Sequence, residues 1–293
     1  MMLTRNSRLI CQSVRLLTKR QFSSPAPVFD AEMAAVYSKM ANQHKHPAGP
    51  WPIMVDEVLK VAKAGDKIVD VASGMGEPAL TIAKALPDAT VFSTDFSEDM
   101  VAKAGVAAAD VPNMTASWMD AQDMKDFEDS SVDIVTCCYG YMFPEDKVKA
   151  LQETRRILKD GGVLVATTWD NVDILKISRD IMTEVIGEAP PPPPLNPMSL
   201  SEPGLFESLI VEAGFDKSKI TQTTSSYPFD LGNERDFQFK VGTLLLRDKL
   251  DELDGWDVAE KAFWDNIDKY SEIDENGNRV MPSNTFRMTI VKK

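Results

Sequence analysis

The stretch VDVASGMGEP, residues 69–78, places two glycines where a run of valine and isoleucine gives way to a run of alanine and leucine. Glycine lets the backbone approach a ligand closely. The first turn of a helix also offers backbone N–H groups that have no partner inside the helix. Gly74 and Gly76 therefore predict a ligand-binding turn between a strand and a helix.

Acidic residues accompany this turn and the end of the next predicted strand. Asp95 ends that strand, where a carboxylate can accept both hydroxyls of a ribose. Two nucleoside ligands fit the arrangement. One is a dinucleotide, because Gly74, Gly76 and Ala79 satisfy the loose G-x-G-x-x-A pattern. The other is S-adenosylmethionine.

Two further acidic residues favour S-adenosylmethionine. Asp70 lies inside the first strand, where its carboxylate can orient the ammonium group of a methionine moiety, whereas dinucleotide sites usually have an apolar residue there. The stretch MDAQDM at 119–124 follows the third strand. It offers Asp120 to the adenine amino group and the backbone of Ala121 and Gln122 to the ring.

With these motifs, residues 67–170 resemble the class I S-adenosylmethionine-dependent methyltransferase family of the small-molecule type. The resemblance implies that Gly74 and Gly76 pass the methionine part of the cofactor, that Asp95 binds the ribose and that Phe96 packs on the adenine, with Asp120 at the adenine edge. It also implies that Cys138 or Tyr139 lines the methyl-transfer point. Ala72 departs from the family, which commonly has a glycine there.

The elements that must position these residues alternate in the order of an α/β protein. Short β-branched runs predict strands at 67–72, 90–95, 114–118, 132–138, 162–168, 219–229 and 284–291. Helical patterns predict helices near 77–86, 97–108, 145–159, 172–187 and 202–213. We expect a doubly wound, mostly parallel seven-stranded sheet, a Rossmann-like methyltransferase fold with a helical lid and cap.

We expect four segments: a presequence at 1–22, an N-terminal helical lid at 23–64, a cofactor-binding core at 65–170, and a substrate cap that also completes the sheet at 171–293. The cap itself is assigned to 171–216 and 231–282. In the lid, two helices flank the connection at 42–52, which holds both histidines of the chain, His44 and His46.

The first 22 residues carry five basic and no acidic side chains, with an apolar side between them. This pattern predicts a mitochondrial presequence with cleavage after Phe22, and hence a matrix protein. After removal of these residues, 27 basic and 45 acidic side chains would remain, a net charge of −18. Such a charge disfavours nucleic acid as a partner.

The composition also limits other classes of site. The 293 residues are 43% apolar, enough for a sizeable core, but no stretch approaches the roughly 18 consecutive apolar residues of a membrane span. The three cysteines have no metal-ligand spacing, so we expect no metal.

The predicted function is S-adenosylmethionine-dependent methylation of a small-molecule acceptor in the mitochondrion. His44, His46 and Tyr141 are the candidate catalytic residues, because transfer to oxygen or nitrogen favours a general base. One alternative is S-methylation of a small thioether acid, such as 4-methylthio-2-hydroxybutyrate in dimethylsulfoniopropionate synthesis. That acceptor has no proton to lose and would suit the aromatic and acidic side chains of the cap, Trp256, Trp264 and Tyr270 among them.

Two other functions stay open. A ubiquinone-pathway C-methyltransferase fits the compartment, but the stretches characteristic of those enzymes after the third and fourth strands are not evident. A non-catalytic cofactor-binding assembly factor of a respiratory complex belongs to a different class, and the intact glycines and strand-end carboxylates argue against it.

Overall fold

The computed structural model describes residues 36, 38–191 and 195–293. The predicted presequence at 1–22, the start of the lid and part of the proline run at 190–194 lie outside these residues. No helix in the described ranges is long and apolar enough to cross a membrane.

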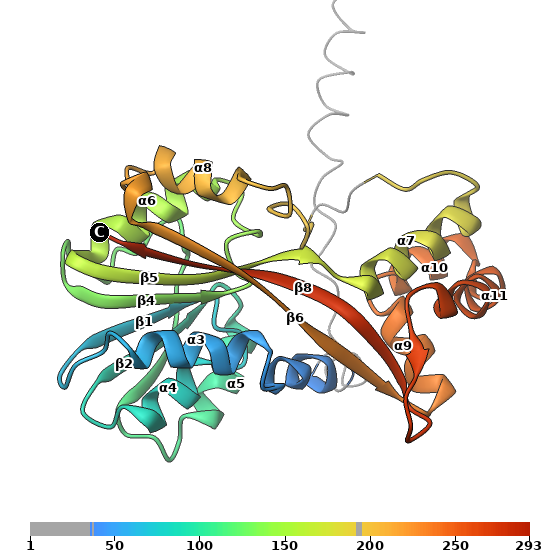
Figure 1. The fold of residues 1–293 in the computed structure, drawn as a ribbon, viewed down its shortest axis with the longest axis horizontal. Helices are drawn as coiled ribbons and strands as arrows, with labels where there is room; N and C mark the ends of the chain where they lie inside the picture. Colours follow the sequence, from blue (N-terminus) through green and yellow to red (C-terminus); the bar gives the residue numbers. More distant parts are fainter. Residues whose placement is uncertain (1–35, 37, 192–194) are drawn as a thin grey trace, which may run out of the picture.

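One eight-stranded sheet organises the molecule, with the order β3-β2-β1-β4-β5-β8-β6 and the short β7 paired to β8 (Figure 1). The pairs among β1 to β5 are parallel, and the pairs made by β8 are antiparallel. The strands are β1 Lys67–Val71, β2 Thr90–Asp95, β3 Met114–Trp118, β4 Val132–Cys138, β5 Leu158–Asn171, β6 Ile220–Gly232, β7 Glu272–Ile273 and β8 Arg279–Lys292. The predicted α/β fold is confirmed, with one more strand than expected.

Helices lie along both faces of this sheet (Figure 1). One layer contains α3 (Pro50–Leu59), α4 (Ala79–Ala85) and α5 (Glu98–Ala107). The other contains α6 (Lys147–Ile157) and α8 (Leu205–Glu212), which contact each other. The carboxyl ends of β1, β2, β3 and β4 are thereby left at one edge, where an open α/β sheet binds its ligand.

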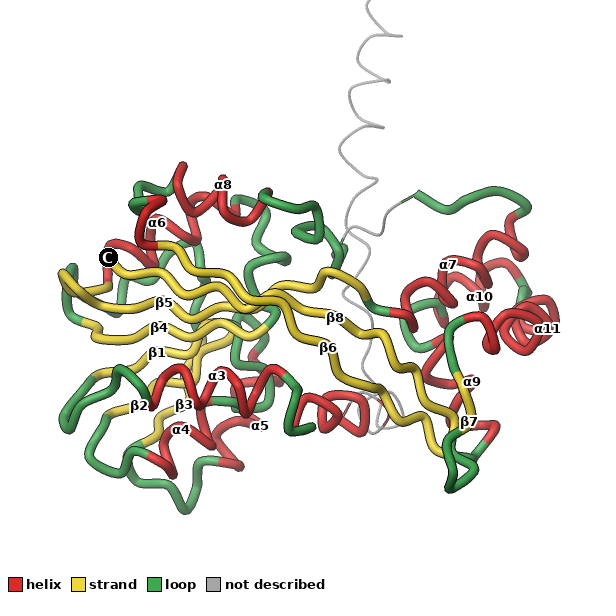
Figure 2. Tube along the Cα trace, in the orientation of Figure 1, coloured by secondary structure: helices red, strands yellow, loops and turns green. Residues whose placement is uncertain are grey.

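The strands β5, β6 and β8 are long, and they continue beyond this edge to a second group of helices (Figure 2). That group contains α7 (Asp173–Ile186), α9 (Arg235–Thr243), α10 (Arg247–Leu253) and α11 (Trp256–Asn266). We call these four helices the cap. Short 3-10 turns lie at Asn42–Lys45 (η1), Lys217–Lys219 (η2) and Ile267–Lys269 (η3).

Two segment assignments made from the sequence were wrong. Residues 202–216 were assigned to the cap, but α8 packs against α6, and Phe206 contacts the buried Tyr141 ring. The connection at 42–52 was expected to be a loop. Instead η1 occupies its first half, and α3 begins at Pro50, a position where proline suits the first turn of a helix.

Candidate active site

The glycine turn after β1 has the open backbone that the sequence predicts. Gly74 and Gly76 have φ of +57° and +102°, and a Cβ added to Gly74 would meet nothing within 4 Å. The turn is fixed to the end of β2, because the Gly74 N–H donates to Asp95 Oδ2 at 2.8 Å. Asp95 Oδ1 accepts from the Ser97 N–H at 2.9 Å. Asp95 therefore faces the turn, as a ribose-binding carboxylate must.

Asp70 is fully buried beside the same turn. Its Oδ1 accepts a hydrogen bond from the Thr136 hydroxyl at 2.6 Å, while its Oδ2 has no hydrogen-bond partner among the described residues. Burial raises the pKa of this carboxyl to about 7. A buried carboxylate with an unpartnered oxygen is a fitting partner for a cationic group such as the methionine ammonium.

The ends of β2 and β3 present two exposed aromatic rings, tilted by 43° to each other. The Phe96 side chain is 66% exposed and lies 5.6 Å from the Trp118 ring, which is 45% exposed. The Trp118 indole donates to the Phe96 carbonyl at 2.7 Å. Exposed aromatic faces at this edge suit the adenine that the sequence places on Phe96.

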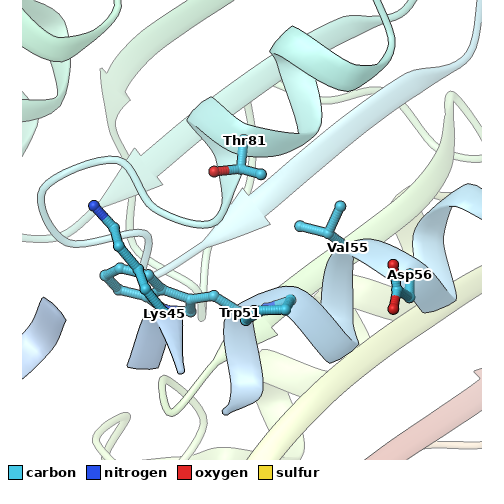
Figure 3. A pocket seen from close by; sticks show the side chains of 6 residues that line it. Lys45, Trp51, Val55, Asp56 and Thr81 are labelled. Atoms are coloured by element: carbon cyan, nitrogen blue, oxygen red, sulfur yellow. The ribbon is translucent and has the colours of Figure 1, made fainter. Parts of the chain in front are cut away.

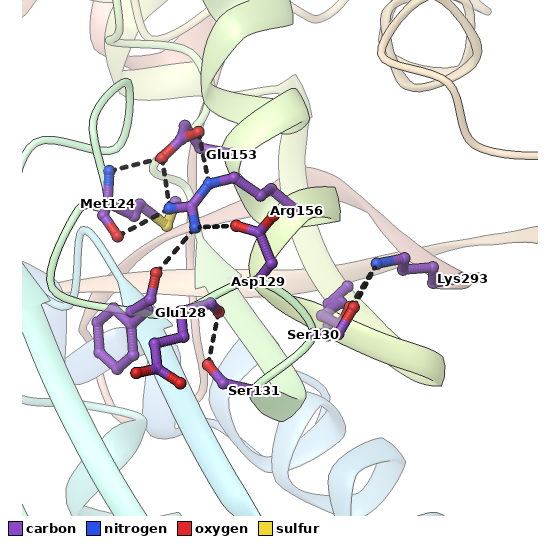
Figure 4. A network of polar contacts seen from close by, with 10 residues as sticks. Met124, Glu128, Asp129, Ser130, Ser131, Glu153, Arg156 and Lys293 are labelled. Carbon is purple, nitrogen blue, oxygen red and sulfur yellow. Dashed lines mark hydrogen bonds and ion pairs between the residues drawn. The ribbon is translucent and has the colours of Figure 1, made fainter.

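The loop after β3 is held by a polar network that the sequence did not predict (Figure 4). Asp120 Oδ1 accepts from the Gln122 N–H at 2.8 Å, which turns the chain next to Ala121. Further along, Arg156 on α6 donates to the carbonyls of Met124 and Phe127 at 2.9 and 2.8 Å. It also pairs with Glu153 and Asp129 at 2.8 Å each. The Arg156 fork thus fixes the loop that carries Asp120.

Ala72 adopts the left-handed backbone that a glycine would take without strain, with φ of +55°. A Cβ added to Gly140 would lie 2.6 Å from the Ala72 Cβ and 2.5 Å from Cys137 Sγ. The missing side chain of Gly140 therefore makes room for the Ala72 methyl group. In the sequence, the contact between Ala72 and residue 140 is indicated only by the presence of Gly140 shortly after β4.

Cys138 ends β4 and Tyr139 follows it, and the methyl-transfer point was expected at these two residues. Cys138 Sγ accepts from the Thr167 hydroxyl at 3.4 Å, and burial raises the pKa of this thiol to about 12, so it stays protonated. Tyr139 has φ of +58° and stacks on Trp169 with ring centroids 3.9 Å apart. Its buried hydroxyl has no hydrogen-bond partner in the described structure.

The Tyr139–Trp169 stack is part of a larger group of aromatic rings. It joins the lid, the ends of β4 and β5, and the strands β6 and β8, and it contains His44, Trp51, Tyr139, Trp169, Tyr227, Phe229 and Phe286. We call these seven residues the aromatic cluster. The sequence did not predict it, because its members come from five distant segments.

The two histidines of the lid are placed differently. His44 lies inside the aromatic cluster, and its Nδ1 is 2.7 Å from the Tyr227 hydroxyl. Burial lowers the pKa of its imidazole to about 3, so His44 is neutral at pH 7 and is a weak base. His46 is exposed at the rim, and its Nδ1 accepts from the Ala48 N–H at 3.1 Å.

Other predicted residues lie elsewhere. Tyr141 is fully buried beneath the sheet edge, where its hydroxyl is 2.6 Å from the Thr154 hydroxyl, so this placement does not fit a catalytic role. Trp256 and Trp264 pack on Phe239 and Phe263 within the cap. The Tyr270 hydroxyl donates to Asp180 on α7 at 2.8 Å. The cap aromatics therefore pack among the cap helices, and the aromatic cluster lies at the strand ends instead.

The region that contains the strand-end residues matches a known family. Residues 68–162 match the family model described as a methyltransferase domain. This matched region, residues 68–162, is the methyltransferase domain of the chain. The unpartnered Asp70 oxygen, the open Gly74 backbone and the exposed Phe96 ring fit S-adenosyl-L-methionine, the cofactor expected from the sequence.

Known proteins support the assignment of the methyltransferase domain. The demethylmenaquinone methyltransferase of Staphylococcus aureus strain JH9 is 36% identical over 124 residues, which is 42% of this chain and 49% of that protein. The same values hold for its counterpart in strain Newman. The chain thus spans about half the length of the curated relatives it matches.

Solved structures share the fold of the methyltransferase domain. The YcgJ protein of Bacillus subtilis has a TM-score of 0.55 at 16% identity, covering 85% of this chain and 99% of that one. Phosphoethanolamine N-methyltransferase 2 of Haemonchus contortus, in complex with S-adenosyl-L-methionine, has a TM-score of 0.53 at 18% identity. It covers 95% of this chain and 59% of that one. At these identities the likeness concerns the fold alone.

No group of three or more acidic, cysteine or histidine side chains that could hold a metal occurs in the described ranges.

Proposed function

We propose that this protein is an S-adenosylmethionine-dependent methyltransferase that acts on a small-molecule acceptor. The observation that carries the proposal is the row of groups at the ends of β1, β2 and β3, which includes Asp70, Asp95 and Phe96 inside the methyltransferase domain. The bound cofactor supplies an electrophilic methyl group. Methyl transfer is a direct displacement, in which the acceptor atom, the methyl carbon and the leaving sulfur lie in line. The chain's own residues hold both reactants in this arrangement, and much of the catalysis is this positioning.

The acceptor site is proposed at the aromatic cluster, which contains Tyr139 and adjoins Cys138 at the end of β4. Apart from Tyr139, its rings come from the lid and from the strands that lead to the cap, so the acceptor would be held mainly by parts of the chain outside residues 68–162. Aromatic faces bind flat apolar rings and cations rather than phosphate. The net charge of −13 also disfavours a nucleic acid acceptor.

A thioether acceptor is the second candidate, and the state of His44 favours it. A neutral imidazole with a pKa of about 3 is a weak base for removing a proton from a hydroxyl or an ammonium group. A thioether sulfur has no proton to lose, and the positive charge that it gains would be stabilised by the surrounding rings. A small thioether acid therefore remains a candidate acceptor, alongside the quinone type that the name of the Staphylococcus relatives suggests.

Ligand binding tests the cofactor. S-adenosylhomocysteine at a hundred times its dissociation constant should stabilise the fold by about 2.7 kcal/mol, and NAD should not. The measurement is thermal unfolding of the purified chain with each ligand. A shift with NAD and none with S-adenosylhomocysteine would contradict the proposal.

Turnover is tested separately, because a cofactor-binding assembly factor would also bind S-adenosylhomocysteine. Incubation with methyl-labelled S-adenosylmethionine and a fractionated metabolite pool should transfer label to a low-mass product. Stable co-purification with a respiratory complex and no labelled product would instead support the non-catalytic role.

We also propose a mitochondrial location, on the basis of the five basic side chains among residues 1–22. Mass spectrometry of the protein from mitochondria should find a mature start near Ser23. A retained Met1 in purified mitochondria would count against import with cleavage.

A further inference from the structure

A cleft of about 320 Å³ lies between η1 and α3 of the lid and α4 of the methyltransferase domain (Figure 3). Lys45 of η1, Trp51 and Val55 of α3, and Thr81 of α4 line it. The turn leads directly into α4, because the Leu80 N–H donates to the Gly76 carbonyl at 2.8 Å. The cleft therefore borders the helix that follows the glycine turn, and the methionine end of the cofactor is expected at that turn.

The cleft also adjoins the proposed acceptor site. The Trp51 ring lines the cleft, and it makes an edge contact with His44 of the aromatic cluster at 5.5 Å. Trp51 thus belongs both to the wall of the cleft and to the aromatic cluster. A group bound in the cleft would lie beside the methyl-transfer point without entering the cluster.

Lys45 is the cation of this cleft. Its ammonium lies 5.7 Å from the centre of the Trp51 ring, and it forms no ion pair or hydrogen bond within the described ranges. Figure 3 shows Lys45 and Asp56 at opposite ends of the row of lining side chains. An ammonium group without a partner favours an anionic group nearby.

The amino-acid end of the cofactor has the complementary charges. Its ammonium group matches the unpartnered Oδ2 of Asp70, on the sheet side of the turn. Its carboxylate then needs a cation on the lid side, where Lys45 lies.

We propose that Lys45 pairs with the carboxylate of the cofactor and that the cleft between η1, α3 and α4 binds its amino-acid end. This inference rests on the proposed function. It makes the lid a part of the cofactor site, with Lys45 as a positioning residue that touches no reacting atom.

Two ligands that differ only in the amino-acid end provide the test. S-adenosylhomocysteine contains the carboxylate, and 5′-methylthioadenosine lacks it but keeps the adenosine and the sulfur. Lys45→Met should weaken binding of S-adenosylhomocysteine about fivefold, the upper range for an exposed ion pair. Binding of 5′-methylthioadenosine should stay within about twofold, and the measurement is calorimetric titration of the full chain.

Two controls accompany this variant. Lys45→Arg keeps the charge and should retain most of the affinity for S-adenosylhomocysteine. Lys60→Met removes a cation of the adjoining lid segment, which pairs with Glu57 at 2.6 Å, and should leave both affinities unchanged. Higher salt should reduce the difference between wild type and Lys45→Met.

The outcomes separate the two proposals. Equal losses for both ligands, or no loss for either, would overturn the role of Lys45 while leaving the proposed function intact. A wild-type chain that binds neither ligand would overturn the proposed function, and the role of Lys45 with it.

Discussion

Two groups at the site have strongly shifted pKa values, raised for Asp70 and lowered for His44. Asp70 affects the pH dependence of stability. Its pKa is raised from 3.8 to about 7, so the folded state retains a proton that the unfolded state loses between these values. The folded state is thereby destabilised as pH rises from about 4 to 7, by at most about 1.4 kcal/mol per pH unit.

Asp70→Asn removes this ionisation and keeps an oxygen that can accept from Thr136. We expect the variant to gain stability over wild type at pH 8 and to show a smaller difference at pH 5, while its affinity for S-adenosylhomocysteine falls. Urea unfolding at the two pH values measures the first effect. The same difference in stability at both values would show that Asp70 ionises normally.

His44 is the second group, and the prediction concerns turnover. With a pKa of about 3, the imidazole does not titrate between pH 6 and 9. The groups that face it are Tyr139, Tyr227 and the Trp51 and Trp169 rings, and burial raises the pKa of both tyrosines.

The pH profile of kcat/KM in His44→Gln should therefore keep every ionisation near pH 7 that the wild-type profile shows. The measurement needs the labelled-methyl assay and a matched His46→Gln variant, since His46 is exposed. If an ionisation near pH 7 disappears in His44→Gln alone, His44 acts as a base and the thioether candidate fails.

At the scale of elements, three polar contacts attach the lid to β6. The Gln43 side chain donates to the Asp230 carbonyl at 3.1 Å and accepts from the Asp230 N–H at 3.2 Å. One residue along, His44 contacts the Tyr227 hydroxyl at 2.7 Å. These contacts join η1 to a strand that also carries the cap.

Tyr227→Phe removes one of these contacts and should cost about 1 kcal/mol of stability. We expect hydrogen exchange to accelerate in residues 38–48 and not in β1 or β4. Tyr270→Phe is the matched control, because it also removes one tyrosine hydrogen bond, to Asp180, but lies away from the lid. Similar exchange in residues 38–48 of both variants would show that the His44–Tyr227 contact does not hold the lid.

The success of the sequence-based predictions also depends on the element. The five parallel strands and the glycine turn were predicted because each is encoded by a local pattern of apolar residues and a turn residue. The placement of α8 was wrong because it depends on contact with α6, which no local pattern reports. The aromatic cluster could not be predicted, since His44 and Tyr227 are 183 positions apart.

The whole molecule should unfold as one unit despite its two groups of helices. Strands β6 and β8 belong to the methyltransferase sheet at one end and contact the cap at the other, with the buried Phe286 and Tyr227 between them. We expect a single calorimetric transition, which Gly140→Ala lowers as a whole because its new methyl group would clash with Ala72. Two separate transitions, only one of them shifted, would show that the cap folds independently.

The same long strands determine how the cap can move. A hinge between cap and core would have to interrupt the hydrogen-bond ladder of β6 and β8, which is paired from Ile220 to Gly232. Twisting of the paired strands β6 and β8 about their common axis breaks no hydrogen bond of the ladder. This twist can concentrate at the register irregularities between Tyr227 and Phe229 and between Asp230 and Gly232. The cap would then rotate about the strand axis, and one flank of the aromatic cluster, Tyr227 and Phe229, would turn with it.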